Sequence, residues 1–315
     1  MAGEVGPNVA PADPVLFFLS DYGTADEFVG VVHAVLHRRA PGVGVIDLSH
    51  QIPPFDVAAG SAMLVRAGPH LGAGVVLAVV DPGVGTDRRA LALEVASGRP
   101  RWMVGPDNGL LVPLATSSGG VRTAVALDPD RLGSAAAPGT FDGRDVFAPA
   151  AAHLVTGGAA GEIGTPIDPA TLVELPVGGT EGRRGIGPAG PRGPEVVSSV
   201  IWIDRFGNAQ LSVGPAALAG IGLAVGGSAL VTVEGGAAAT GESPAGGVVG
   251  GRLPVPGRWV TAFGQLGEGE LGVMEDANGQ MSLVVDRASA ALALGLRGPG
   301  DTVRIGGGGG GGPRT

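Results

Sequence analysis

The sequence predicts an α/β protein: a mostly parallel sheet with flanking helices, followed by a small C-terminal β-barrel domain. Two observations lead to this prediction. In the first half of the chain, short apolar runs alternate with segments of helical periodicity, the pattern of a largely parallel sheet covered on both faces. In the second half, short apolar runs are separated by Gly-rich turns, which is typical of a small barrel.

The elements of the first half follow in order. We expect strands at residues 15–19, 43–48, 74–80, 90–95, 102–104 and 121–127, and helices at residues 25–39, 56–67 and 145–156. The first helix places Phe28, Val32 and Leu36 on one face, and Asp56 is a suitable N-cap for the second. Together these elements form a predicted N-terminal domain of residues 14–176.

The second half follows a segment rich in Gly, Pro and Arg without apolar periodicity, which we interpret as a linker at residues 177–195. Beyond it we expect a β-barrel domain of residues 196–305, with strands at 196–204, 223–225, 228–233, 259–263, 271–275, 281–285 and 302–305. The Gly-rich end, residues 306–315, is expected to be a disordered tail.

Composition narrows the classes of function. The chain has 315 residues and a formal net charge of −9, which argues against a nucleic-acid partner. It has no cysteine, so disulfides, thiolate metal sites and Cys nucleophiles are excluded. No apolar run approaches the roughly 20 residues that span a bilayer. We therefore expect a cytoplasmic protein that acts on a small molecule, with no membrane partner.

The most informative segment is the end of the apolar run that starts at Val75. Asp81 follows this run, and Arg88 stands on the far side of a Pro-Gly turn. Asp21 and Asn108 also follow apolar runs, and ligands bind at the carboxyl ends of strands in open α/β sheets, so these residues are expected to share one site. The structural alternatives are an ion pair of Asp81 with Arg88, a helix cap at Asp21 and an ordinary turn at Asn108.

A second polar segment, residues 140–145, precedes the third predicted helix. Either Thr140, Phe141 and Asp142 lie on a loop that faces the site, or Asp145 caps the helix and Arg144 lies on the surface. The sequence alone leaves both interpretations open.

In the second half, the comparably polar strand end is residues 203–208, with Asp204, Phe206 and Asn208. This segment is either a hairpin turn or a contact for a planar base, which needs an aromatic ring beside an amide.

The histidines suggest no metal site. His33 and His37 are four residues apart on a predicted helix, which is the spacing of a metal-binding pair. The nearest acids, Asp26 and Glu27, are better interpreted as first-turn residues that complement the helix dipole. We therefore expect no bound metal, and His50, at a strand end, is expected to orient a loop.

The chain resembles the S-adenosylmethionine (SAM) hydroxide adenosyltransferases, relatives of the fluorinases and chlorinases, over about residues 15–305. The resemblance rests on six segments in the family's order and spacing: LSDYG, DLSHQIPPFDV, VVDPGVGTDRR, GPDNGLL, TFDGRDVFAPAA and IDRFGN. It implies an N-terminal α/β domain, a C-terminal β-barrel, and a homotrimer with its sites between subunits. It also implies cleavage of SAM by water to adenosine and methionine, without a cofactor.

The resemblance implies particular site residues. Asp81 and Arg88 match the family's catalytic Asp and Arg beside the attacking water, and Asp142 stands where the family has its catalytic His. Asp21 matches the carboxylate that holds the ribose, and Phe206 and Asn208 match contacts to the adenine and the methionine side. The full set of expected substrate-binding residues is Asp21, Asn108, Thr140, Phe141, Asp204, Phe206, Asn208, Ala277, Ser282 and Val285. Of these, Ala277 and Ser282 replace a Ser and a Glu of a late family motif.

These matches predict hydrolysis by an Asp-Arg-Asp arrangement. Asp81 would accept the water proton, Arg88 would stabilise developing charge, and Asp142 would supply a second carboxylate, so that one of the two pKa values is raised. A SAM- or adenosine-binding protein without activity is the alternative. A halogenase is less favoured, because Asp81 would repel a halide and Gly143 stands where fluorinases carry a halide-binding Ser.

Overall fold

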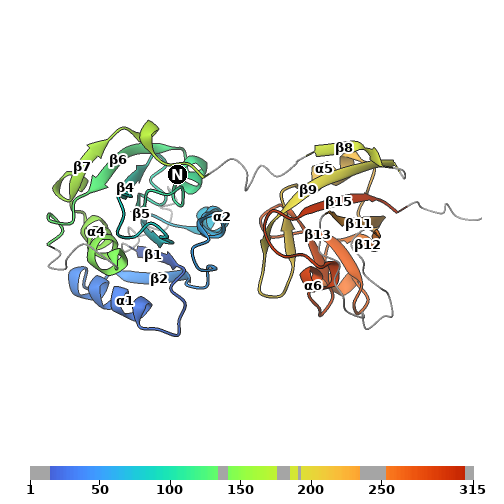
Figure 1. The fold of residues 1–315 in the computed structure, drawn as a ribbon, viewed down its shortest axis with the longest axis horizontal. Coiled ribbons are helices and arrows are strands. Elements are labelled where there is room, and N and C mark those ends of the chain that lie inside the picture. Colours follow the sequence, from blue (N-terminus) through green and yellow to red (C-terminus); the bar gives the residue numbers. More distant parts are fainter. Residues whose placement is uncertain (1–14, 134–140, 176–184, 191–192, 235–252, 309–315) are drawn as a thin grey trace, which may run out of the picture. The chain divides into compact units, whose positions relative to one another are not determined.

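The computed structural model describes residues 15–133, 141–175, 185–190, 193–234 and 253–308. The chain divides into two compact units, residues 1–175 and 176–315, each of which has its own sheet (Figure 1). The two units are described separately below.

The N-terminal unit contains a seven-stranded mixed sheet in the order β2-β1-β3-β5-β4-β6-β7. The strands β1 (Val15–Ser20), β2 (Gly44–Ser49), β3 (Gly74–Val79) and β5 (Trp102–Pro106) pair in parallel with one another in the order β2-β1-β3-β5. The strands β4 (Ala90–Val95), β6 (Val121–Leu127) and β7 (Gly164–Ile167) pair antiparallel. The prediction of an α/β sheet is confirmed, but only half of the sheet is parallel. Too few residues separate β4 from β5 for a crossover helix, so these strands form a hairpin.

Helices cover both faces of this sheet (Figure 1). On one face, α1 (Phe28–Arg39) packs against α4 (Ala148–Val155), which continues a π-helical turn, η2 (Gly143–Phe147). On the other face, α2 (Val57–Ala67) contacts α3 (Val112–Ser117), and Gly60 of α2 lies against Val80. The Asp56 side chain caps α2 by accepting a hydrogen bond from the Ala59 N–H at 2.9 Å, as the sequence predicts.

The strand pattern explains this two-sided burial. Phe18, Leu77 and Val79 point toward α1 and α4, where Val32 and Leu36 complete the core. The intervening residues of the same strands point to the opposite face, and they are buried there as well. Continuous apolar strands therefore fix the sheet as the central layer and leave their carboxyl ends as its polar edge.

The C-terminal unit is a closed seven-stranded barrel in the order β10-β14-β13-β12-β11-β15-β9, which a β10–β9 pairing closes. The predicted barrel is thus confirmed. Its strands are β9 (Gly193–Ile203), β10 (Ala209–Leu211), β11 (Ser228–Glu234), β12 (Val255–Val260), β13 (Leu271–Glu275), β14 (Met281–Val285) and β15 (Thr302–Gly307). An additional strand, β8 (Gly185–Gly190), pairs with β9, and two short helices are α5 (Pro215–Gly220) and α6 (Ala290–Leu294). Four 3-10 turns are η1 (Gly68–His70), η3 (Ala160–Glu162), η4 (Pro169–Thr171) and η5 (Phe263–Gln265).

Three expectations about the second half need correction. Part of the predicted linker at residues 177–195 forms β8 and the start of β9, because strand pairing uses the backbone and needs no apolar periodicity. The strand expected at residues 223–225 is a turn between α5 and β11, flanked by Gly222 and Gly226 at φ +79° and +83°. Strand β15 extends to Gly307, into the predicted tail, whose residues 309–315 lie outside the described part of the chain.

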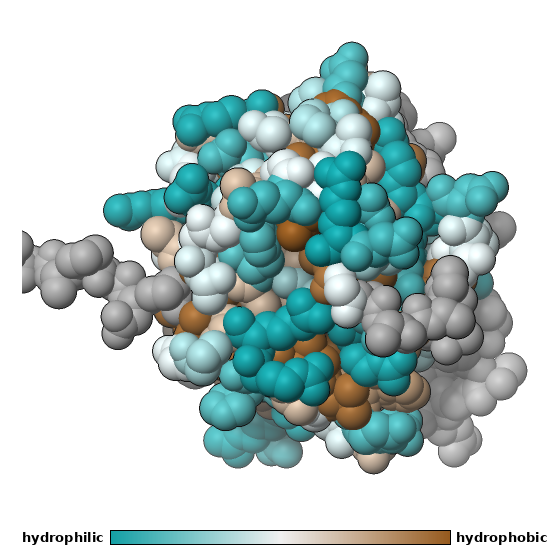
Figure 2. Space-filling view, turned by 90° about the vertical axis from the view of Figure 1, so that its left-hand side faces the viewer, coloured by the Kyte–Doolittle hydropathy of each residue, from teal (hydrophilic) through white to brown (hydrophobic). Residues whose placement is uncertain are grey.

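Among the described residues, no helix is long and apolar enough to cross a bilayer. On the face shown in Figure 2, hydrophilic residues predominate and hydrophobic residues occur in small separate patches.

Candidate active site

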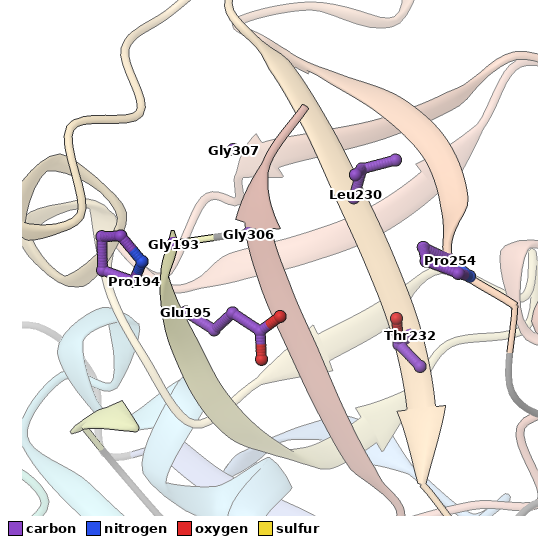
Figure 3. A pocket seen from close by; sticks show the side chains of 8 residues that line it. All are labelled: Gly193, Pro194, Glu195, Leu230, Thr232, Pro254, Gly306 and Gly307. Carbon is purple, nitrogen blue, oxygen red and sulfur yellow. The ribbon is translucent and has the colours of Figure 1, made fainter. Parts of the chain in front are cut away.

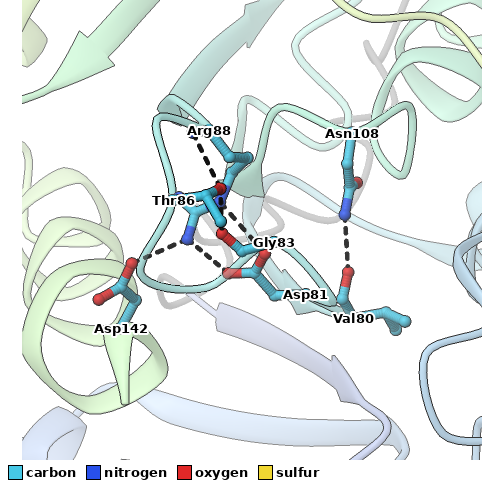
Figure 4. Close-up of polar contacts among 7 residues, drawn as sticks. All are labelled: Val80, Asp81, Gly83, Thr86, Arg88, Asn108 and Asp142. Atoms are coloured by element: carbon cyan, nitrogen blue, oxygen red, sulfur yellow. Dashed lines mark hydrogen bonds and ion pairs between the residues drawn. The ribbon is translucent and has the colours of Figure 1, made fainter. Parts of the chain in front are cut away.

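The centre of the site is the loop that leaves the carboxyl end of β3. Two turns shape it: the Val84 N–H donates to Asp81 O at 3.3 Å, and the Thr86 N–H donates to Gly83 O at 3.1 Å. Gly85 adopts φ +78°, a backbone conformation that suits glycine. The loop therefore folds back on itself and carries Arg88 toward the strand end it has just left (Figure 4).

Arg88 binds Asp81 through two parallel contacts. Its Nε lies 3.1 Å from Asp81 Oδ1, and its Nη2 lies 2.5 Å from Asp81 Oδ2. The two side chains are only 8% and 6% exposed. A bidentate guanidinium–carboxylate pair of this kind fixes the orientation of both groups.

Asp142 joins this pair from the π-helical turn that precedes α4. Its Oδ2 accepts a hydrogen bond from Arg88 Nη2 at 2.8 Å, and its side chain is 20% exposed (Figure 4). Asp142 stands at the start of the π-helical turn, and the Arg88 guanidinium also lies 5.3 Å from the centre of the Phe147 ring. The structure thus brings together the three predicted catalytic residues, with one arginine between two carboxylates.

The surroundings of Asp81 make its carboxylate more basic than that of an ordinary aspartate. Burial raises its pKa, and the negative charge of Asp142 raises it further. The charge and hydrogen bonds of Arg88, and the backbone of Gly83, act in the opposite direction without cancelling the effect of burial. A carboxylate with a raised pKa is better suited to accept a proton from water.

Tyr22 is a candidate site residue that the sequence reasoning missed. Its hydroxyl lies in the field of Asp21, Asp81 and Asp142, and burial together with these charges raises the Tyr22 pKa well above its usual value. The hydroxyl therefore stays protonated and remains a hydrogen-bond donor beside the carboxylates. The available signal was that this is the single tyrosine of the chain and directly follows Asp21.

Packing holds the Tyr22 ring in place. Its centre lies 6.5 Å from that of Phe18, 5.9 Å from that of Phe28 and 5.6 Å from that of Phe141. Phe141 thus belongs to this aromatic group. Next to it, Gly143 leaves room for the tyrosine: a Cβ atom at position 143 would lie 2.1 Å from the Tyr22 hydroxyl oxygen.

Asp21 does not cap the following helix. Helix α1 begins only at Phe28, and the Asp21 Oδ2 accepts a hydrogen bond from the Phe55 N–H at 2.9 Å. Ser20 pairs with Val79 in the parallel register of β1 and β3, so Asp21 and Asp81 leave the sheet at the same edge. Asp21 therefore lies at the predicted site and also connects two of its loops.

Phe55 is a second residue that the sequence reasoning missed. Its side chain is 70% exposed, and its φ of +67° is unusual for a residue with a bulky side chain. Such a conformation costs free energy and persists where neighbouring contacts enforce it. Here the hydrogen bond to Asp21 provides one such contact, which makes the loop before α2 a candidate part of the site.

Other predicted residues of this unit have structural contacts. The Asn108 side chain donates to Val80 O at 2.8 Å and accepts from the Leu110 N–H at 3.2 Å, so it fixes the strand end just before Asp81 (Figure 4). Arg144 forms two hydrogen bonds with Asp145, at 2.8 and 2.7 Å, within the π-helical turn. The alternative in which Asp145 caps the helix is therefore wrong, because the turn already starts at Gly143.

Thr140 lies outside the described residues.

Arg89, although adjacent to Arg88, has a different partner. Its Nε lies 2.7 Å from Asp107 Oδ2, and the Asp107 side chain is almost fully buried. This second pair connects β4 to the β5 edge and contributes to the fold beside the site.

In the C-terminal unit, Asp204, Phe206 and Asn208 form one turn between β9 and β10. Asp204 Oδ1 accepts from the backbone N–H groups of Phe206 and Asn208, at 2.8 and 2.9 Å, and Oδ2 accepts from the Asn208 side chain at 2.8 Å. Asp204 is therefore the residue that shapes the turn. The Phe206 ring is 72% exposed, which leaves it free to contact a planar ligand.

The remaining predicted residues do not gather at one place. Strand β10 pairs with β14, with Ala209 opposite Leu283, so the turn before β10 and the buried Val285 lie at the same end of β14. Ala277 is exposed in the turn at the other end. Ser282 is buried and donates to Asp276 at 3.1 Å, a contact that stabilises that turn. Val285 is thus placed with Phe206 and Asn208, whereas Ala277 is not.

A surface hollow in the barrel lies elsewhere (Figure 3). It is lined by Gly193, Pro194, Glu195, Leu230, Thr232, Pro254, Gly306 and Gly307, on the strands β9, β11 and β15 and at the approach to β12. No predicted site residue contributes to it.

Comparisons with known proteins bear on most of the chain. The model of the SAM hydroxide adenosyltransferase N-terminal domain matches residues 16–164, and that of the C-terminal domain matches residues 198–304. The chain belongs to the SAM hydroxide adenosyltransferase family. The two matches cover both units, with the Asp81–Arg88–Asp142 cluster in the first and the Asp204–Asn208 turn in the second.

Relatives within and beyond this family are similar along much of the chain. An (R)-S-adenosyl-L-methionine hydrolase of Salinispora tropica is 40% identical over 293 residues, 93% of this chain and 97% of the relative. One from Thermus thermophilus is 41% identical over 290 residues, 90% and 96% of the two chains. A fluorinase of an Actinoplanes species is 26% identical over 187 residues, 53% and 62% of the two chains.

A solved structure has the same fold. The crystal structure of an uncharacterized conserved protein from Thermotoga maritima superposes with a TM-score of 0.76 at 28% identity, covering 92% of this chain and 99% of the other.

Proposed function

We propose that this protein hydrolyses SAM to adenosine and methionine, by in-line attack of water on the C5′ carbon of the substrate. The observation that carries the proposal is the Asp81–Arg88 pair, which is nearly buried at the carboxyl edge of the sheet and has the geometry of an oriented base. The names of the similar hydrolases from Salinispora and Thermus support the same reaction.

The chemistry needs little more than an oriented water. The carbon under attack carries a sulfonium, so the leaving group departs as methionine, a neutral thioether, and needs no acid or metal to expel it. The slow element is the weak nucleophile. Asp81, with its raised pKa, accepts a proton from the water, and the fixed geometry holds the water in line with the C–S bond.

Arg88 supports this step in two ways. It holds the Asp81 carboxylate in one orientation, and its positive charge stabilises the hydroxide character that develops on the water. Asp142 shares the same Arg88 nitrogen, and in this proposal it takes the place of the family's histidine as the second proton acceptor.

Substrate binding completes the proposal. Asp21 is assigned to the ribose hydroxyls, and the exposed Phe206 ring with Asn208 to the adenine and the methionine side. We assign the R configuration at the sulfonium of the substrate, because the names of the similar hydrolases specify it. A homotrimer with sites between subunits, a cytoplasmic location and independence of any cofactor remain parts of the same proposal.

A halogenase is disfavoured by two observations. The cluster has two carboxylates and one guanidinium, so a halide would approach a net negative charge in a site with little water to screen it. A serine at position 143, which would supply a halide-binding hydroxyl, would collide with Tyr22.

The test is an incubation of the purified protein with each sulfonium epimer of SAM, free of halide and metal, with adenosine and methionine measured by chromatography. We expect the two products in equal amounts, and no turnover by Asp81→Asn, which should still bind adenosine. The matched control is Asp87→Asn, the same change at an exposed position of the same loop, which should remain active.

Other outcomes would replace the proposal. Bound adenosine without product would mean a binding protein. A halogenated adenosine formed only after chloride is added would mean a halogenase. Full activity of Asp81→Asn would remove Asp81 from the mechanism.

A further inference from the structure

The structure assembles a second polar cluster, which the proposed reaction does not use. His33 of α1, Asp47 of β2 and His50, just after β2, meet at one point. His33 Nε2 lies 2.9 Å and His50 Nε2 3.1 Å from the same atom, Asp47 Oδ1. All three atoms lie within 4.8 Å of one another. The helical pair His33 and His37 considered from the sequence is therefore not the relevant one.

His50 provides an independent sign that a ligand is missing from this cluster. Its side chain is 5% exposed, and its Nε2 has no hydrogen-bond partner among the described residues, although it lies close to Asp47 Oδ1. A buried ring nitrogen without a hydrogen bond is unfavourable and uncommon in folded proteins. A cation placed between the three side chains would satisfy it.

The other nitrogen of His50 is already held as it would be in a metal ligand. His50 Nδ1 lies 2.8 Å from Ser20 Oγ. When Nδ1 carries the proton, it donates to Ser20 and leaves the Nε2 lone pair free. Histidines that bind metals usually donate their second N–H to a protein oxygen in this way, which fixes both the tautomer and the ring orientation.

We propose that His33, Asp47 and His50 form a zinc-binding site. Two imidazole nitrogens and one carboxylate oxygen are a common set of three protein ligands for Zn²⁺. Metal–ligand distances of about 2.0–2.2 Å in a tetrahedron separate neighbouring ligand atoms by about 3.3–3.6 Å. The observed 2.9 and 3.1 Å separations need only a small opening to reach this range.

The same observations exclude some alternatives. Mg²⁺ and Ca²⁺ favour sets of oxygen ligands, which this cluster does not provide. His33 and Asp47 are 35% and 43% exposed, so a metal ion can enter from solvent and keep water in its fourth position. The rival interpretation is a hydrogen bond between His33 and Asp47 that serves the fold alone.

From its position, bound zinc would stabilise the two loops that carry Asp21 and Phe55. Ser20 directly precedes Asp21, and the Gly23 N–H donates to His50 O at 2.7 Å. The loop after His50 leads to Phe55, whose N–H binds Asp21. A metal at His50 would thus join α1 and β2 to both loops that carry Asp21 and Phe55, without entering the Asp81–Arg88–Asp142 cluster.

The test uses full-length protein without a histidine tag, treated with a chelator and then titrated with zinc chloride by isothermal titration calorimetry. We expect one equivalent of zinc to bind. His33→Lys keeps a cation beside Asp47 but removes the ligand, and Asp47→Asn keeps the shape of the side chain. Each should weaken zinc binding at least tenfold, whereas His37→Ala, one helical turn away and exposed, should bind as the unaltered protein does.

A second measurement separates coordination from loose association. With Co²⁺ in place of zinc, we expect visible absorption bands of a four-coordinate ion, and their loss in His33→Lys. No specific binding, binding unchanged in His33→Lys, or binding lost equally in His37→Ala would each overturn the proposal. Circular dichroism shows whether each variant is folded, and the result holds whether or not the protein hydrolyses SAM.

Discussion

The contact between Gly143 and Tyr22 gives a prediction that tests the site through its packing. Gly143→Ala adds one carbon atom beside the Asp81–Arg88–Asp142 cluster, at 2.1 Å from the Tyr22 hydroxyl oxygen and 3.2 Å from Phe141 Cε2. An ordinary contact is about 3.4 Å or longer, so the tyrosine or the π-helical turn must move by about 1.3 Å. The aromatic neighbours of Tyr22 leave its ring little freedom to do so.

The cost can be worked from this geometry. Adding a methyl group to a well-packed interior costs about 1–3 kcal/mol. For a unit of this size, 1 kcal/mol corresponds to about 2–4 °C in Tm, so Gly143→Ala should lower Tm by about 2–12 °C. A displacement of about 1 Å next to Asp142 should also reduce turnover by about a hundredfold.

Differential scanning calorimetry measures Tm, and chromatography measures SAM turnover, for Gly143→Ala and for three further variants. These are Tyr22→Phe, the double variant Tyr22→Phe with Gly143→Ala, and Gly30→Ala. Tyr22→Phe deletes the oxygen and leaves the Cζ atom at 3.1 Å, so adding it to Gly143→Ala should recover much of the lost stability. Gly30→Ala makes the same change in α1, where no atom lies within 4 Å, and should stabilise by up to about 1 kcal/mol. An unchanged Tm for Gly143→Ala, or no recovery in the double variant, would refute the reasoning.

Two further predictions concern chemistry and binding. Asp81 must be ionised to accept a proton, so kcat/KM should fall as pH drops through the Asp81 pKa, which lies above that of an ordinary aspartate. Asp142→Asn removes one negative charge that raises this pKa, so the acid limb of the pH–rate profile should move to lower pH. An acid limb that stays in place would contradict the assignment. Phe206→Ala should leave Tm unchanged, because the ring is 72% exposed, and should raise the KM for SAM about tenfold, because stacking on the ring is lost. The control variant Phe263→Ala should change neither Tm nor KM. An unaltered KM for Phe206→Ala would remove Phe206 from the site.

Much of the fold followed from local patterns. Continuous apolar runs located the strands of the N-terminal sheet, and Asp56 marked the start of α2. The helices and strands that escaped prediction are short: α3, α5 and α6 have six, six and five residues, and β7, β8 and β10 have four, six and three. Segments of this length contain less than two full helical turns, so their periodicity is too brief to recognise, and tertiary packing forms them.

The site was predicted in part for the same reason. Asp81 and Arg88 stood out because a turn sequence directly joins them, so a local pattern implied their contact. Tyr22 and Phe55 did not stand out, because their importance comes from loops that are distant in the sequence. The sequence singled out Arg88 as the partner of Asp81, and the structure adds that the adjacent Arg89 binds a different carboxylate, Asp107.

The sequence by itself determined the two-part architecture, the polar strand ends and the family to which the chain is similar, since each is written in contiguous residues. Only the tertiary structure decided which side chains from distant segments meet. It placed one arginine between Asp81 and Asp142, and it paired His33 with Asp47 and His50 instead of His37. Helical spacing fixes neighbours on one helix surface, whereas contacts between elements depend on how the helices and the sheet pack.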